Sequence, residues 1–241
     1  MIFTLIRAFQ SGNTENLKWA IAMVVLSLPV IILALSVHET AHGFVAYKLG
    51  DPTARNMGRL TLNPTKHLDP IGFICMLAFS FGWAKPVPIS TRNFKKPRRD
   101  MAISAVAGPI SNILLAFVFA GLLKIFYMVI ENIPISGDEQ TVETLSTLFT
   151  VIVILLSLGV VINVSLAVFN LLPIPPLDGS KILYMFLPQK YLIMFLQYER
   201  YISLALLVLL ALDVLTVPLS FLSGGIIDFI EFVYQMPIPI R

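Results

Sequence analysis

A stretch of nineteen residues without a charged side chain, Trp19 to Val37, most constrains how this chain can fold. As an α-helix it would rise about 28 Å, close to the thickness of the hydrocarbon core of a bilayer. The stretch runs directly into His38. We therefore expect a membrane-spanning helix from Trp19 to about Lys48, kinked at Pro29, with His38 at or just inside one membrane face.

The composition extends this prediction to most of the chain. Of the 241 residues, 57% are hydrophobic and 13% are charged, whereas a soluble domain is about 45–50% apolar and about 25% charged. The sequence predicts an all-α polytopic membrane protein with about five to six membrane-embedded helices. We expect one domain over residues 1–241, with a core at 19–185 and accessory helices at 200–236.

The residues between the predicted spans indicate a β segment and a topology. Turn signals in residues 53–70 predict short strands or a hairpin, that is, a β segment near residues 55–70. Further spans are expected at 101–130 and 145–172, with a piece too short to span at 71–83 and one or two helices within 201–234. The loop 85–100 holds six Lys and Arg residues, whereas 131–144 holds four acidic residues and no basic ones. Because basic loops stay in the cytoplasm, we expect a cell-membrane protein whose His38 end is cytoplasmic.

The histidines lie in an H-E-x-x-H arrangement. On a helix, residues four apart share one face, so His38 and His42 can offer two imidazoles to one metal ion, with Glu39 beside them. Such a site suits zinc, and Glu39 could take a proton from a zinc-polarised water, the first step of metal-assisted hydrolysis. With one cysteine, Cys75, and three histidines in the chain, further ligands must be His, Asp or Glu.

A third ligand is expected where the chain returns to the same membrane face, after residue 172. Asp178 follows three prolines at the end of an apolar span, and ionisable residues at membrane depth are functional-site candidates. Two histidines and one carboxylate form the open ligand set of a catalytic zinc. Asp178 could instead cap the helix that follows it.

Four other polar residues allow more than one interpretation. Asn170 could end its helix or bind a substrate oxygen. Asn112 could bind substrate as well, or belong to a small-residue segment that lets helices approach closely. His67 fits a turn residue better than a metal ligand, and the sequence does not decide the role of Asp213.

These motifs resemble the site-2 protease family of intramembrane zinc metalloproteases. His38 to His42 matches the family's H-E-x-x-H, residues 170–179 match N-x-x-P-x-x-x-L-D-G, and residues 107–112 resemble its A-G-P-x-x-N element. Residues 62–70, with His67, resemble the family's membrane-dipping β segment. The resemblance runs from about residue 30 to 185 and implies a minimal prokaryotic-type member without an inserted accessory domain.

The resemblance also implies an activity. It implies one Zn²⁺ per chain, held by His38, His42 and Asp178, with Glu39 as the general base. The enzyme would be an intramembrane zinc endopeptidase that cuts single-pass membrane proteins or signal-peptide remnants in the lipid bilayer, as in regulated intramembrane proteolysis. The alternative is a metal-ion transporter or channel that uses the same His/Asp site and needs further ionisable residues across the bilayer. The modest net charge of +3 is interpreted as topology, so no nucleic acid partner is expected.

Overall fold

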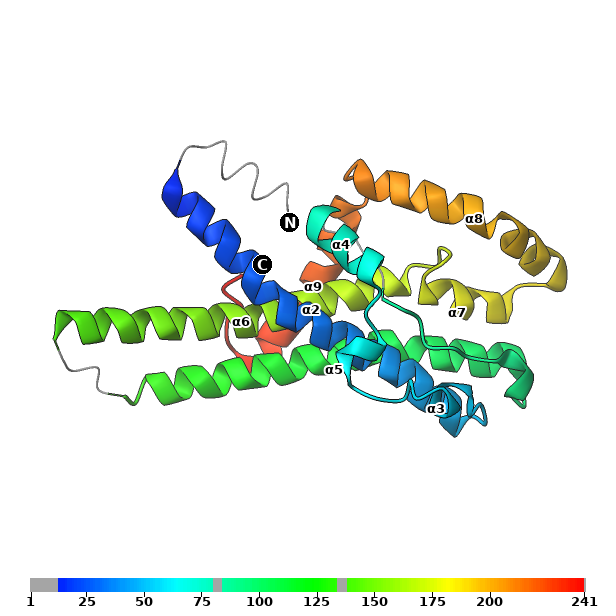
Figure 1. Cartoon of the computed structure of the whole chain (residues 1–241), viewed down its shortest axis with the longest axis horizontal. Helices are drawn as coiled ribbons and strands as arrows, with labels where there is room; N and C mark the ends of the chain where they lie inside the picture. Colours follow the sequence, from blue (N-terminus) through cyan, green and yellow to red (C-terminus); the bar gives the residue numbers. More distant parts are fainter. Residues whose placement is uncertain (1–12, 80–83, 134–137, 241) are drawn as a thin grey trace.

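The computed structural model describes residues 13–79, 84–133 and 138–240, which are mostly helical (Figure 1). The long helices are α2 (Thr14–Lys48), α5 (Pro97–Ile130), α6 (Glu139–Leu171), α8 (Gln189–Ala211) and α9 (Thr216–Tyr234). Each of these five helices is long and apolar enough to cross a membrane. The prediction of an all-α polytopic membrane protein is therefore confirmed.

The predicted β segment near residues 55–70 takes a different form. The short elements of the described chain are α3 (Thr53–Asn56), the 3₁₀ turn η1 (Pro64–Lys66), α4 (Pro70–Phe79), the 3₁₀ turn η2 (Thr91–Asn93) and α7 (Asp178–Phe186). No strand occurs among the described residues, and an isolated antiparallel bridge joins Leu68 to Ala84. The reason lies in the Asn63-Pro64 pair: the Asn63 side chain accepts a hydrogen bond from the Thr65 amide at 3.1 Å and so caps a helical turn.

The helix boundaries follow from local capping. α2 begins at Thr14 rather than Trp19, because the Asn13 side chain accepts the Glu15 amide at 2.9 Å. α5 begins at Pro97 rather than 101, where proline is already suited to the first helical turn. Of the short piece expected at 71–83, α4 covers residues 70–79, while residues 80–83 lie outside the described chain.

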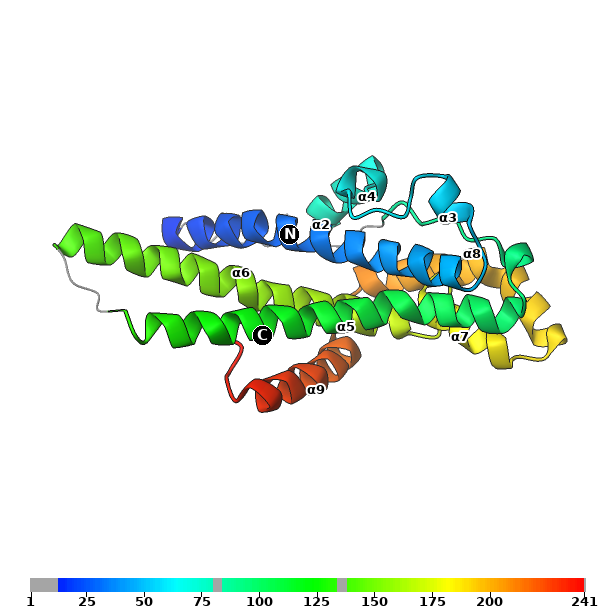
Figure 2. The same cartoon turned by 90° about the horizontal axis from the view of Figure 1, so that it is seen from below.

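Helices α5 and α6 form an antiparallel hairpin, and α2 packs against both of them (Figures 1 and 2). Figure 2 shows α3 and α4 on one side of this three-helix core and α9 on the other. Small residues allow the close approach: a Cβ on Gly159 of α6 would overlap the ring of Phe119 on α5. Large apolar side chains on the outer faces stay exposed, as lipid contact requires.

A hydrophobic cluster lies between α5, α6 and α9. Its buried members include Ala116, Leu123, Val160 and Val164 of α5 and α6. The segment after α9 packs on this cluster, with Met236 and Ile238 buried and the Ile238 amide donating to Glu231 at 2.8 Å. The cluster therefore fixes α9 and the segment after it to the α5–α6 hairpin.

Candidate metal centre

The two predicted histidine ligands lie side by side on α2. His38 and His42 are 4% and 7% exposed. Their ring centroids are 4.6 Å apart and their planes stand at 88° to each other. The four-residue spacing places both rings on the face of α2 that packs on α5, so both imidazoles point into the bundle.

Asp178 reaches the same point from the first residue of α7. Its Oδ2 lies 3.0 Å from Nε2 of both His38 and His42, although it is 140 residues from His38 along the chain. The tight turn after α6 makes this possible, because Gly179 sits directly against the Leu171 and Leu172 carbonyl oxygens, where a Cβ would overlap the backbone. The structure thus brings the three predicted ligands together.

The geometry fits a zinc ion. The ligand atoms of His38, His42 and Asp178 all lie within 4.8 Å of one another. Ligand atoms about 2.0–2.1 Å from a tetrahedral zinc are roughly 3.3 Å apart, close to the 3.0 Å from Asp178 Oδ2 to each Nε2. Three protein ligands leave the fourth position open, as in catalytic zinc sites. Within the described residues, no other group of this kind occurs.

Hydrogen bonds fix the outer nitrogen of each imidazole. His38 Nδ1 donates to Asn112 Oδ1 at 2.5 Å, and His42 Nδ1 donates to the Ser104 carbonyl at 2.7 Å. The Asn112 amide in turn donates to Asn163 Oδ1 at 2.8 Å and to the Ala34 carbonyl at 3.3 Å. A proton on each Nδ1 leaves the Nε2 lone pairs free for a metal, which is how outer hydrogen bonds orient metal-binding histidines.

Gly108 of α5 allows the helices to close over the two rings. A Cβ at this position would lie 2.5 Å from His42 Nε2 and 2.6 Å from His38 Cε1. Real Cβ atoms do not approach other heavy atoms this closely. In the A-G-P-x-x-N element, glycine therefore suits position 108 because any side chain would clash with the histidines. Asparagine suits position 112 because its side chain binds His38.

Lys181 and Val87 contact the acidic residues of the site. The Lys181 ammonium lies 3.0 Å from Asp178 Oδ1, so the other carboxylate oxygen faces the histidines. The Val87 amide donates to Glu39 Oε2 at 2.8 Å. Val87 belongs to residues 84–90, an irregular, non-helical segment that we name the strap.

Asp51 fastens the far end of the strap just after α2. This fully buried carboxylate accepts hydrogen bonds from the Thr53 amide and hydroxyl, the Asn93 side chain and the Ser90 amide, the last at 2.7 Å. Burial alone would raise the pKa of Asp51, but these hydrogen bonds outweigh it and lower the pKa below its usual range. Asp51 therefore stays ionised at neutral pH and holds Ser90 in place.

Two predicted substrate-binding residues have other contacts. Asn112 is completely buried and bound to His38, which supports an orienting role, while substrate binding by Asn112 stays a prediction. The Asn170 amide donates to the Leu166 carbonyl of its own helix at 2.9 Å, and a role toward substrate stays a prediction. His67 is completely buried near Thr61, and Asp213 lies exposed between α8 and α9 with a positive φ of 57°.

Sequence reasoning missed Ser104, Asn163, Lys181 and Val87 as partners of the site. Ser104 binds the His42 ring, and Val87 binds Glu39, through backbone groups, which carry no side-chain signal. Lys181 stands three residues after Asp178 at the start of a helix, a spacing that favours side-chain contact and could have indicated it.

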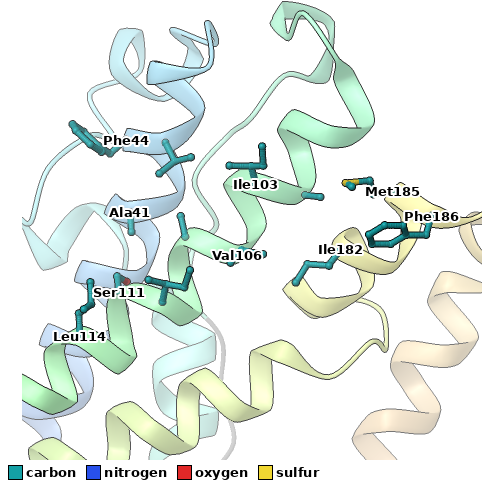
Figure 3. A pocket seen from close by; sticks show the side chains of 13 residues that line it. Ala41, Phe44, Ile103, Val106, Ser111, Leu114, Ile182, Met185 and Phe186 are labelled. Carbon is teal, nitrogen blue, oxygen red and sulfur yellow. The ribbon is translucent and has the colours of Figure 1, made fainter.

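An apolar groove of about 480 Å³ lies beside the site, between α2, α5 and α7 (Figure 3). Ala41 and Phe44 of α2, Val106 of α5 and Ile182 of α7 line it. Neither the histidines nor Asp178 is part of its wall. The groove therefore does not reach the ligand atoms.

Paired imidazoles, a carboxylate and an adjacent glutamate inside a bundle of apolar helices define a membrane metalloprotease. The chain belongs to peptidase family M50, whose family model matches residues 26–212. This finding confirms the resemblance to site-2 proteases and identifies the protein as a zinc metalloprotease of the membrane.

Curated relatives carry matching names. The chain is 41% identical over 179 residues to "Putative zinc metalloprotease YwhC" of Bacillus subtilis (strain 168), covering 74% of this chain and 77% of the relative. It is 30% identical over 170 residues to "Putative zinc metalloprotease MJ0611" of Methanocaldococcus jannaschii, covering 69% and 73%. It is 28% identical over 163 residues to "Putative zinc metalloprotease Rip2" of Mycolicibacterium smegmatis, covering 66% and 56%. No solved structure gives a significant match.

Proposed function

We propose that this protease cleaves peptide bonds within or next to the transmembrane segments of single-pass membrane proteins. One observation carries the proposal: His38, His42 and Asp178 converge inside a bundle of helices suited to span a bilayer. A peptide bond can be cut there only if the substrate enters the membrane region. The protease class is established by the family, whereas the substrate class is our proposal.

We assign the roles as follows. His38, His42 and Asp178 would hold zinc, which would supply Lewis-acid polarisation of the scissile carbonyl and of a water molecule. Glu39 takes a proton from the attacking water and later delivers it to the leaving amine. Because the Val87 amide donates its hydrogen bond to Oε2 of Glu39, we assign Oε1 as the oxygen that accepts the proton of the water.

A helical substrate must unwind before it can be cut, because its carbonyl groups are hydrogen-bonded within the helix. The unwound segment needs new backbone partners in a site surrounded by lipid. The strap runs beside Glu39. Its Lys85, Val87 and Ser90 amides are already bonded, so its carbonyl groups are what it offers to the amides of an unwound peptide. Residues 60–69 pack alongside the strap through the Leu68–Ala84 bridge.

We also propose that the site opens toward the cytoplasm of the cell. The basic residues of the 85–100 loop support this orientation, since basic loops stay cytoplasmic. Cleavage at that face would release a cytosolic fragment of a membrane-tethered protein, as in regulated intramembrane proteolysis, or clear signal-peptide remnants from the bilayer.

The test is to map the cleavage sites in single-pass substrates reconstituted with the enzyme in liposomes, using mass spectrometry of the products. We expect cuts within or next to the transmembrane segment, on the side of its cytoplasmic end. A glycine placed beside the cut should speed cleavage about five-fold, since glycine destabilises a helix by about 1 kcal/mol.

Zinc chelation is the control for this test. Chelation should stop cleavage, and added zinc should restore it. Cuts confined to water-exposed domains, or cleavage that survives chelation, would contradict the proposal. Zinc flux into liposomes without any proteolysis would favour the transporter alternative.

A further inference from the structure

His67 is a buried titratable residue that the proposed mechanism does not use. Its side chain is completely buried, and its Nε2 donates to the Thr61 carbonyl at 2.6 Å. The Thr40 hydroxyl donates to the same carbonyl, also at 2.6 Å. Thr40 follows Glu39 on α2. The His67 side chain is therefore tied, through one shared acceptor, to the helical turn that carries Glu39.

The backbone of His67 holds the beginning of the strap. The His67 carbonyl accepts the Lys85 amide at 2.7 Å, and the Leu68–Ala84 bridge lies next to this bond. Val87, whose amide binds Glu39, is two residues further along. Pro86 stands between them with a fixed φ angle, so the position of Lys85 restricts where the Val87 amide can point.

The strap is also held in place on the C-terminal side of Val87. Ser90 is bound by Asp51, as described above, and the Val87 side chain is buried against α2 near Gly43. A Cβ on Gly43 would lie 3.1 Å from Val87 Cγ1, so little space remains for the strap to shift inward. With these contacts in place, His67 is the anchor of the end nearer to Lys85.

We propose that His67 is a positioning residue for the general base. Its side chain fixes residues 61–68 to the Glu39 turn of α2, and its carbonyl fixes the strap, so that the Val87 amide holds the Glu39 carboxylate in one orientation. The inference rests on the proposed role of Glu39. It gives the third histidine of the chain a function distinct from metal binding, because its Nε2 faces the Thr61 carbonyl.

Two substitutions of His67 separate positioning from folding. His67→Leu removes the donor to Thr61, whereas His67→Gln keeps an N–H donor at the position of Nε2. We expect His67→Leu to lower kcat about 10- to 100-fold with KM nearly unchanged, since a displacement of about 1 Å at a catalytic group can cost a factor of about 100. His67→Gln should retain kcat to within about three-fold, because the hydrogen bond is kept.

Leu123→Ala is the control for general destabilisation. Leu123 is completely buried in the hydrophobic cluster, so its truncation should lower the melting temperature. It lies on α5 away from the strap, and kcat should stay near the wild-type value. Equal losses of kcat in Leu123→Ala and His67→Leu would overturn the proposal, because stability alone would then explain both.

Hydrogen exchange at the Val87 amide tests the same link without any substrate. The bond to Glu39 should protect this amide in the wild type. We expect about ten-fold faster exchange in His67→Leu and wild-type exchange in His67→Gln, since loss of local structure raises the exchange rate. Unchanged exchange or unchanged kcat in His67→Leu would each refute the positioning role. A wild type that cuts no membrane substrate would count against the proposed function, while the exchange result would still decide whether His67 holds the strap.

Discussion

Glu39→Gln should abolish peptide cleavage while leaving the protein folded and loaded with zinc. Glutamine matches glutamate in length, and its carbonyl oxygen can still accept the Val87 amide that now lies 2.8 Å from Glu39 Oε2. What it cannot do is take a proton from water. General base catalysis contributes about 10²- to 10⁴-fold, so the loss of turnover should be at least about 100-fold.

The measurement is kcat for a reconstituted transmembrane substrate, together with zinc content and melting temperature. Glu143→Gln is a suitable control, because Glu143 is exposed near the start of α6 and far from the histidines in the sequence. This control should cleave at the wild-type rate. Cleavage by Glu39→Gln at the wild-type rate would remove Glu39 from the mechanism.

Gly108→Ala should disable the metal centre by adding a single carbon atom. The new Cβ would lie 2.5 Å from His42 Nε2 and Cε1, which forces either the rings to rotate or α5 to move away from α2. Rotation of the rings would weaken the bonds to Asn112 and Ser104 that orient them. Loss of such outer contacts lowers metal affinity or activity about 10- to 100-fold, and we expect zinc affinity to fall by that factor.

Gly121→Ala on the same helix is the matched control for this substitution. Its Cβ would lie 3.1 Å from the Tyr234 hydroxyl, the end of a side chain that can shift. Both substitutions favour a helix to the same extent, so only the steric effect differs. Zinc affinity measured by competition with a chelator should fall in Gly108→Ala alone. Equal affinities in the two variants would contradict the close contact between Gly108 and the histidines.

The helices and the metal ligands could be predicted from the sequence because each is recorded in a local pattern. The uncharged stretch before His38 defines α2, and the H-E-x-x-H spacing defines the imidazole pair. Asp178 could be found as well, because the predicted topology returns the chain to the same membrane face. Placing Asp178 at the same membrane depth as the histidines required, in addition, the predicted ends of the spanning helices.

Contacts between distant backbone groups could not be predicted in this way. The Ser104 carbonyl and the Val87 amide act through atoms that every residue carries, so nothing in the sequence marks them. Asn63-Pro64 is compatible with a turn between strands and with the cap of a helical turn, and the structure has the cap. The contact of Asn112 with His38 depends on which face of α5 packs against α2, and only the tertiary structure shows that face.

X-ray absorption spectroscopy of the zinc-loaded protein tests the central claim most directly, because it identifies the atoms bound to the metal. We predict one zinc per chain with two imidazole nitrogens and oxygen ligands, at about 2.0–2.2 Å, and with one imidazole fewer in His42→Ala. A zinc–sulfur distance of about 2.3 Å, which only Cys75 or a methionine could supply, or a shell with a third imidazole from His67, would contradict the His38, His42 and Asp178 centre.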